Sequence, residues 1–183
     1  MVKEIIFIEL NKLSYLSYRE QIFKLYFKAF TTGKYAQYIE RSSVEVAIDE
    51  LINIGCGIMA FSDERLVGFL IASPLSAHSE FHFNNLENVL VDKTIYINEI
   101  AVDADFRGRG IAEKMIKIYT DKILHKYHNA VIRVWEENIP ALSLYKKLNF
   151  NPIASITQLK VRTNGEEFEM NKIYLIKKLI ADN

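Results

Sequence analysis

The sequence contains a single cysteine, Cys56, among its 183 residues. One thiol forms neither an intrachain disulfide nor a cysteine-based zinc cluster, which agrees with a reducing compartment. The opening segment carries acidic residues where a signal peptide needs an uninterrupted apolar stretch, and no later stretch approaches the ~20 apolar residues that cross a bilayer. These absences predict a cytoplasmic protein with no membrane partner.

The chain also lacks an excess of either charge, because 23 basic residues balance 23 acidic ones. This balance argues against a nucleic-acid binder that works by neutralising phosphates. The charges are unevenly placed: residues 1–35 carry 6 basic and 3 acidic groups, residues 36–106 carry 3 and 12, and residues 107–183 carry 14 and 8. Either the asymmetry is solvated surface, or one side of the fold attracts anions and another cations.

Glycine (7) and proline (3) are scarce, whereas half of the residues are hydrophobic and 12% are aromatic. This composition supplies a sizeable core and excludes wholesale disorder. A length of 183 residues fits one domain, since domains average ~150 residues. No repeat or linker divides the sequence, so we expect residues 1–183 to form a single domain.

Hydrophobic periodicity predicts strands and helices along the whole chain. Strands are expected at 2–10, 57–61, 66–72, 94–102, 130–135, 153–162 and 168–179, and helices at 14–30, 43–54, 110–127 and 140–148. The strand, helix, strand succession over 94–135 predicts a right-handed crossover between two parallel strands. Asn164-Gly165 predicts a type I′ hairpin turn between the last two strands. Residues 74–93 are expected to form a loop with a short helix.

The most informative segment is a loop with two glycines, Asp103-Ala-Asp-Phe-Arg-Gly-Arg-Gly-Ile-Ala112, before the third expected helix. The first amides of a helix lack intrahelical partners, so glycines there let a phosphate approach them. Arg107 and Arg109 add permanent positive charge. The loop lacks the Gly-Lys-Ser/Thr of a Walker loop, and Glu113 occupies the third-glycine position of a dinucleotide fingerprint. The remaining alternatives are another kind of phosphate loop or a glycine turn that binds nothing.

The pattern Arg-x-x-Gly-x-Ala, formed by Arg107, Gly110 and Ala112, resembles the pyrophosphate loop of the GNAT superfamily of acyl-CoA-dependent N-acetyltransferases. In that superfamily the loop has the form Gln/Arg-x-x-Gly-x-Gly/Ala. The preceding strand ends in Ile-Ala-Val, and Ala104 stands where the superfamily often has proline. The resemblance is strong over residues 94–151.

A second stretch, Asn138-Ile-Pro-Ala-Leu-Ser-Leu-Tyr145-Lys-Lys-Leu-Asn149-Phe150, supports the same resemblance. It is similar in order and spacing to the superfamily's Asn, two residues, Ala, three residues, Tyr, three residues, Gly-Phe. Asn149 replaces the usual glycine, and asparagine is a common alternative in the left-handed conformation that follows a helix. We therefore expect position 149 to keep its backbone role.

The resemblance implies an α/β fold of the α+β type. It consists of a mixed, mostly antiparallel central sheet with helices on both faces and one parallel pair of strands that splay apart. It also implies acetyl-CoA as cosubstrate, whose pantetheine lies in the cleft and contacts the backbone of Ile100, Ala101 and Val102. Asn138 is expected either to contact pantetheine or to cap the helix that begins next to it. The residues implied at the phosphates are Arg107, Gly108, Arg109, Gly110, Ile111 and Ala112.

The implied reaction is direct attack by an amine on the thioester. An aliphatic amine has a pKa of ~10.4, so freeing its lone pair at neutral pH costs ~4.6 kcal/mol and calls for a base. Glu99 is the candidate base, because a carboxylate within a central strand is costly to bury without a task. The alternative is a structural Glu99 that pairs with a cation or reaches solvent. Some relatives use an acid five positions before the Asn, but Arg133 occupies that position here.

Tyr145 corresponds to the superfamily's usual general acid for the leaving thiolate, the alternative being a tyrosine that only packs in the core. No metal is expected, because His125 and His128, three apart on a helix, lack further ligands. We expect Asp103 and Asp105 to be solvated turn residues, since acidic groups would repel a phosphate.

The acceptor is not encoded in a motif. The net charge of −9 in residues 36–106 favours a small cationic amine, with a protein N-terminus or lysine as the alternative and a non-catalytic acyl-CoA sensor as a third hypothesis. His78 and His82 are expected to face water, although they could line the acceptor pocket. The C-terminal hairpin could pair two subunits as a homodimer. An aromatic run is expected to be mostly core and partly the edge of the acceptor site: Tyr26, Phe27, Phe30, Tyr35 and Tyr38.

Overall fold

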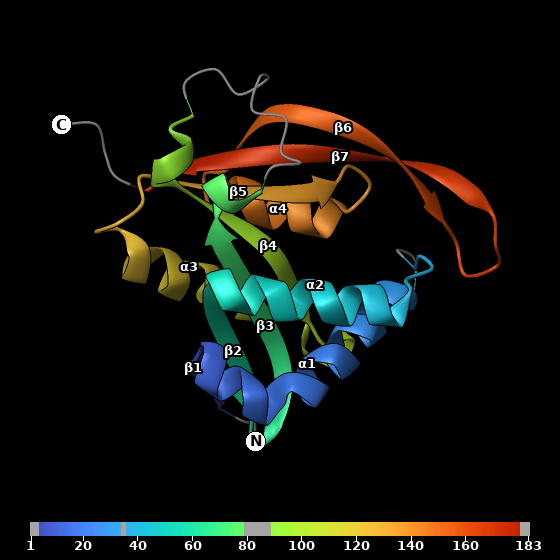
Figure 1. The fold of residues 1–183 in the computed structure, drawn as a ribbon, viewed down its shortest axis with the longest axis horizontal. Helices are drawn as coiled ribbons and strands as arrows, with labels where there is room; N and C mark the ends of the chain where they lie inside the picture. Colours follow the sequence, from blue (N-terminus) through green and yellow to red (C-terminus); the bar gives the residue numbers. More distant parts are fainter. Residues whose placement is uncertain (1–3, 34–35, 79–88, 180–183) are drawn as a thin grey trace.

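A computed structural model describes residues 4–33, 36–78 and 89–179 (Figure 1). In these ranges the strands form one seven-stranded sheet with the order β1-β2-β3-β4-β5-β7-β6. Strands β4 and β5 run parallel, and the other neighbours are antiparallel. The mixed, mostly antiparallel sheet with one parallel pair is therefore confirmed. Two residues considered above, Tyr35 and His82, lie outside the described ranges.

The predicted strands and helices are present, with ends that differ by a few residues. The strands are β1 (Ile5–Leu10), β2 (Cys56–Ser62), β3 (Arg65–Pro74), β4 (Thr94–Val102), β5 (Asn129–Trp135), β6 (Asn151–Val161) and β7 (Glu167–Lys178). The helices are α1 (Lys12–Thr31), α2 (Arg41–Ile54), α3 (Ile111–Ile123) and α4 (Ile139–Lys147). Short 3-10 turns are η1 (Leu75–Ala77), η3 (Val91–Lys93) and η4 (Ala104–Phe106). Among these helices, none combines the length and apolar character needed to cross a membrane.

Helices cover both faces of the sheet, as expected. Helices α1 and α2 pack on one face, where Phe23 and Ile48 join Phe69 of β3 in a buried cluster. Helix α3 packs on the other face, where Met115 joins Leu70 of β3. Successive residues of β3 thus point to opposite cores, which explains why this strand is apolar throughout. In Figure 1, α2 crosses in front of the sheet.

The parallel pair separates toward the carboxyl ends of its strands. The described pairing joins Thr94–Ile97 of β4 to Asn129–Ile132 of β5. Beyond it, β4 continues to Val102 and β5 to Trp135. The sheet therefore opens between these two strand ends, in agreement with the predicted splayed pair.

A bulge bends β4 where the opening begins. On its other edge, Glu99 is opposite Ile71 of β3, whereas Ile97 is opposite the next residue, Ala72. Asn98 is the extra residue between them. A bulge of this kind kinks the strand and redirects the side chains that follow, and the first of these is Glu99.

The turn between β6 and β7 differs from the expected type I′. A type I′ turn requires positive φ at both central residues. Gly165 has a φ of +88°, but Asn164 is not among the described residues with positive φ. Gly165 N donates to Arg162 O at 3.0 Å, and Arg162 N donates to Glu166 O at 2.8 Å. The connection is a three-residue loop with glycine in the left-handed position, so the type I′ prediction is wrong.

Candidate active site

The predicted phosphate loop lies between η4 and α3. Gly108 and Gly110 have φ values of +74° and +75°, a left-handed conformation that strains other residues. In the described chain, nothing lies within 4 Å of the position where a Cβ would stand on either glycine. Helix α3 begins after Gly110 with no side-chain cap among the described residues. The first amides of α3 thus retain the capacity to bind an anion from outside the chain.

The backbone of the loop holds its two arginines. Arg107 Nε donates to Val102 O at 3.2 Å, and Arg109 Nη2 donates to Asp105 O at 3.0 Å. The guanidinium carbon of Arg109 also lies 4.8 Å from the centre of the Phe106 ring. Arg107 lines the open space over the glycines, whereas Arg109 is not part of its lining. Of the two, Arg107 is the one placed to contact a ligand there.

Asp103, expected to be a solvated turn residue, is only 4% exposed. Its carboxylate accepts hydrogen bonds from Lys28 Nζ at 2.9 and 3.2 Å and from Arg65 Nη2 at 2.5 Å. It also accepts from the backbone N of Asp105 at 3.1 Å. Burial opposes ionisation, but these donors prevail and keep the pKa of Asp103 below its usual value. The expectation was wrong because the cations come from α1 and β3; Asp105 is exposed, as expected.

Three adjoining cavities lead from the loop to the opening between β4 and β5. The loop cavity, of about 280 Å³, lies over the glycines and the start of α3. The strand cavity, also about 280 Å³, shares part of its lining with the loop cavity: Val102, Arg107, Ala112, Pro140 and Leu144. The central cavity, of about 180 Å³, shares four residues with the strand cavity: Phe30, Ile100, Asn138 and Tyr145. The three cavities form one path from the phosphate loop to the middle of the sheet.

Most of the residues expected to bind the cofactor line this path. Ile100, Ala101 and Val102 line the strand cavity. Asn138 Oδ1 accepts a hydrogen bond from Ala141 N at 3.3 Å, so the side chain caps α4. Asn138 also borders the strand and central cavities. Its capping role is therefore present, and its position is compatible with a contact to a ligand as well.

The residues that end α4 fix the position of Tyr145. Phe150 N donates to Tyr145 O at 2.9 Å, Asn149 N donates to Lys146 O at 3.0 Å, and Asn149 has a φ of +65°. This is a Schellman motif, in which Asn149 takes the place of the usual glycine, as predicted. The Tyr145 side chain is buried, with its ring centre 5.9 Å from that of Phe150. Burial, together with the charge of Glu99, raises the pKa of Tyr145, so its phenol stays protonated.

Glu99, half-buried after the bulge in β4, lines the central cavity together with Tyr145. Burial raises the pKa of Glu99 to about 7, against the opposing effect of Arg133, Lys172 and Lys160. A carboxylate with a pKa near neutrality is suited to accept and release protons at physiological pH. The fold thus brings the predicted base and the predicted acid to one cavity, although their roles stay predictions.

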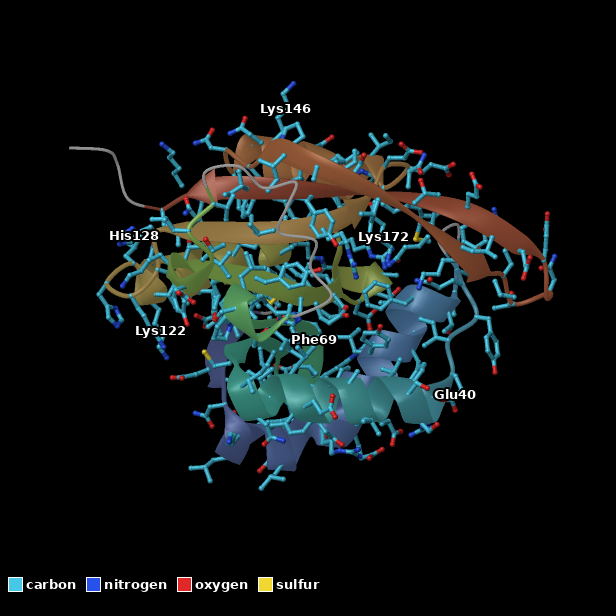
Figure 2. All side chains as sticks on the ribbon, turned by 45° about the horizontal axis from the view of Figure 1, so that its top comes forward. Glu40, Phe69, Lys122, His128, Lys146 and Lys172 are labelled. Carbon is cyan, nitrogen blue, oxygen red and sulfur yellow. The ribbon has the colours of Figure 1, made fainter. Side chains whose placement is uncertain are left out.

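Sequence analysis did not assign two cationic side chains to this cavity. Arg133 of β5 and Lys172 of β7 are both part of its lining. Figure 2 shows Lys172 between β7 and the C-terminal part of α1. Burial, reinforced by the charges of Arg133 and Lys160, lowers the pKa of Lys172 to about 8. Strand periodicity indicates that successive side chains of β6 and β7 point to opposite faces of the sheet, but it does not say which face meets the cavity.

A fourth cavity, of about 400 Å³, lies beside α2 and is called here the helix-side cavity. It shares four lining residues with the central cavity: Tyr96, Asn98, Glu99 and Arg133. His78 also lines it and is only 8% exposed, with Nε2 2.7 Å from Ser73 Oγ. The expectation that His78 faces water is therefore wrong. Tyr26 and Phe30 line the central cavity, as the prediction that part of the aromatic run forms an edge of the acceptor site requires. The other part of that prediction is wrong, because the described members of the run are at most partly buried and Tyr38 is exposed.

These features together match the arrangement that the sequence resemblance implied: a glycine loop at a helix start, a parallel strand pair that parts, and a carboxyl and a phenol at the parting. The sequence model of the Acetyltransferase (GNAT) family matches residues 19–150. The match covers well over half of the chain, which therefore belongs to this family and is an acyltransferase.

Solved acetyltransferases have a similar fold. The ribosomal-protein-S18-alanine N-acetyltransferase of Escherichia coli aligns with a TM-score of 0.69 over 98% of this chain and 97% of its own, at 14% identity. Arabidopsis thaliana NAA60, solved with acetyl-CoA, aligns with a TM-score of 0.67 over 96% of this chain and 98% of its own, at 21% identity. N-alpha-acetyltransferase 30 of Saccharomyces cerevisiae is 38% identical over 56 residues, which are 30% of this chain and 32% of the yeast protein. The sequence match thus spans about a third of that relative.

Proposed function

We propose that this protein transfers an acetyl group from acetyl-CoA to a primary amine by direct attack in a ternary complex. The observation that carries the proposal is the position of Glu99 and Tyr145 on one cavity, where β4 and β5 part. That cavity adjoins the path to the phosphate loop through Ile100 and Asn138. An acyl donor anchored at the loop would therefore present its reactive end to both groups.

The residues along the path fit the parts of acetyl-CoA. The amides at the start of α3 and the Arg107 guanidinium are suited to a diphosphate, because both supply positive charge to an open cavity. The strand cavity offers apolar side chains and the free edge of Ile100–Val102 to a pantetheine chain. When bound, acetyl-CoA supplies the activated acyl group. The Arabidopsis NAA60 structure, which has the same fold and was solved with acetyl-CoA, supports this assignment.

Glu99 has the position and the pKa of a general base. The pKa of Glu99, about 7, lies below that of an aliphatic ammonium, ~10.4, so proton transfer from the ammonium to Glu99 is unfavourable by itself. Attack on the thioester consumes the free amine and so drives this proton transfer forward. Glu99 takes the proton that the amine loses as the new N–C bond forms, either directly or through a water. A main-chain amide at the end of β4 would stabilise the negative charge that develops on the thioester oxygen.

Tyr145 is suited to protonate the departing sulfur as the C–S bond breaks. Its raised pKa keeps the phenol in the donor form at neutral pH. The proton that Tyr145 gives to the thiolate is replaced from solvent, and Glu99 returns its proton to solvent. The balanced products are an acetylated amine and the free thiol of CoA, with one proton released for each protonated amine consumed.

The α-amine of a protein N-terminus is the second candidate acceptor. It is supported by the names of similar proteins, among them a ribosomal-protein-S18-alanine N-acetyltransferase and an N-alpha-acetyltransferase. A small amine remains the first candidate, as expected from the sequence. A non-catalytic acyl-CoA sensor is disfavoured because Glu99 and Tyr145 line the same cavity. A sensor would not need a base and an acid placed together.

Three measurements test the proposal. Calorimetric titration with CoA should give heat, CoA should raise the melting temperature in thermal denaturation, and release of the CoA thiol from acetyl-CoA should depend on an added amine. The amines should include small molecules and short peptides with free N-termini, because the faster set identifies the acceptor class. Absence of CoA binding would overturn the whole assignment, whereas binding without transfer to any acceptor would support the sensor.

A further inference from the structure

Three cations from three strands converge on one face of the sheet. Arg133 of β5 lies opposite Tyr174 of β7, and Lys160 of β6 lies opposite Phe168 of β7. Residues directly opposite each other in antiparallel strands share a face, and residues two apart on a strand do so too. Phe168, Lys172 and Tyr174 are separated by even numbers of positions, so Arg133, Lys160 and Lys172 all project from the same face. This face meets the central cavity, which Arg133 and Lys172 line.

The positive charge of these residues is not neutralised within the described parts of the chain. Arg133 Nη1 donates to Tyr174 Oη at 3.3 Å, a neutral partner, and no ion pair joins Arg133, Lys160 or Lys172 to a described acidic side chain. Among the described residues lining the central cavity, Glu99 is the sole acidic one, and its pKa of about 7 leaves it partly protonated. Repulsion among the cations adds to burial in lowering the pKa of Lys160 and Lys172. The cavity therefore carries net positive charge that a ligand could balance.

Several of the described acidic residues behind the expectation of a cationic acceptor do not line the central cavity. Asp49 forms a hydrogen-bonded ion pair with Arg19 at 2.8 Å. Asp103 is paired with Lys28 and Arg65. Glu50, which lines the helix-side cavity, is exposed to solvent. The net charge of residues 36–106 is thus a poor guide to the charge of the cavity.

A second positive charge on the acceptor would be repelled in this cavity, whereas a carboxylate would be attracted. A guanidinium also matches a carboxylate geometrically, because its donors form two parallel hydrogen bonds. The cations favour the neutral form of a nearby amine as well, which assists the deprotonation that the reaction requires.

We propose that the acceptor carries a carboxylate close to its reactive amine and that Arg133 and Lys172 bind this carboxylate, with Lys160 adding positive charge on the same face of the sheet. The proposal rests on the proposed function and specifies its substrate class. Two sources supply this chemistry: the α-carboxylate of a free amino acid, and the side chain of an aspartate or glutamate at the N-terminus of a peptide. Because Glu99, Arg133 and Lys172 line the same cavity, an amine at Glu99 and a carboxylate at the two cations would be separated by few bonds.

Isosteric acceptor pairs test the proposal in the wild-type protein with acetyl-CoA and a thiol-release assay. Peptides that begin with Asp or Glu are compared with otherwise identical peptides that begin with Asn or Gln. Free glutamate and glutamine are compared with their α-carboxamides. We expect kcat/KM to be at least tenfold higher for the carboxylate member of the pair that represents the true source.

Variants of the cationic residues then test whether they recognise the carboxylate. Lys172→Met should reduce the preference at least fivefold, mainly by raising KM for the acidic acceptor and leaving KM for the neutral isostere unchanged. Lys172→Arg should retain the preference, and Lys160→Met provides a second variant should Lys172→Met fail to fold. Lys12→Met, at an exposed position in the first turn of α1, removes the same charge and should change nothing.

The outcomes separate this proposal from the proposed function. Equal or higher kcat/KM for the neutral members, with transfer still present, overturns the carboxylate proposal and leaves acetyl transfer in place. An unchanged preference in both lysine variants overturns the assigned residues. Absence of transfer to every acceptor, with CoA still bound, overturns the proposed function and the carboxylate proposal with it.

Discussion

The raised pKa of Glu99 makes a prediction about stability that is independent of any substrate. A carboxyl group whose pKa rises from 4.5 to about 7 on folding binds its proton more tightly in the folded state. Ionisation then opposes folding, so the penalty is absent below pH 4.5, grows between pH 4.5 and 7, and is constant at higher pH. Glu99→Gln removes the ionisable group and keeps the shape of the side chain. The variant should therefore be more stable than the wild type in alkaline but not in acidic solution.

The magnitude follows from the size of the shift. Each pKa unit corresponds to ~1.36 kcal/mol, so a shift of this size gives an upper limit of ~3.4 kcal/mol. Because Glu99 is only half-buried and borders a cavity, solvent reduces the effect. We expect Glu99→Gln to raise the free energy of unfolding by about 1–3 kcal/mol at pH 8 and by well under 1 kcal/mol at pH 5.

Urea denaturation of both proteins at the two pH values measures this difference. Glu113→Gln is a control of opposite sign, because hydrogen bonds from Lys147 and Lys117 lower the pKa of Glu113 to about 2. That variant should lose stability at pH 8. Equal stability of Glu99→Gln and the wild type at both pH values would refute the reasoning, since Glu99 would then be fully solvated. In the transfer assay, wild-type kcat/KM should show an inflection near pH 7 from the ionisation of Glu99, and the variant should lose this inflection along with ~10²–10⁴ in rate.

Three further substitutions test other parts of the site. Tyr145→Phe should lower kcat about 10- to 100-fold and leave CoA affinity unchanged in calorimetry, and an unchanged kcat would contradict the acid role. Gly110→Ala should weaken CoA binding at least tenfold, because a Cβ would enter the open space over the loop. Gly33→Ala is the matched control, because Gly33 has a φ of +76° and the substitution imposes similar backbone strain without affecting binding. Asp103→Asn should lower the free energy of unfolding by about 1–3 kcal/mol at pH 7. Since the pKa of Asp103 is lowered in the folded state, this loss of stability should disappear as the pH falls below that lowered pKa. The same substitution at the exposed Asp105 should have little effect in the same urea experiment.

Local signals in the sequence account for the elements and for part of the site. Gly110 and Asn149 occupy left-handed positions that the residue types indicate, and Asn138 caps α4 as its position before Pro140 suggests. Glu99 was chosen as the candidate base because it is a carboxylate within a central strand, and Tyr145 was chosen from its place in the second motif. In each case the information lies within about one turn of helix or one strand, which is the range over which sequence patterns are informative.

Long-range contacts account for two of the errors. Asp103 was expected to be a solvated turn residue because an acidic group would repel a phosphate, but its partner Lys28 comes from the first helix. The charge of the central cavity was missed because Arg133, Lys160 and Lys172 belong to three strands whose order in the sheet differs from their order in the chain. The net charge of a segment is summed over residues that are neighbours in sequence. The charge of a cavity depends on residues that are neighbours in space.

The short pairing between β4 and β5 has a mechanical consequence. Four residue pairs join one part of the sheet, β1 to β4, to the other part, β5 to β6, and the end of β4 beyond them lines both the strand cavity and the central cavity. A ligand on the loop side and a ligand in the central cavity would thus both contact β4, and a displacement of this strand by one would change the affinity for the other. Such a linkage is reciprocal. The mutual effect of the two reactants on their affinities should therefore depend on how stiffly these four pairs hold β4 against β5.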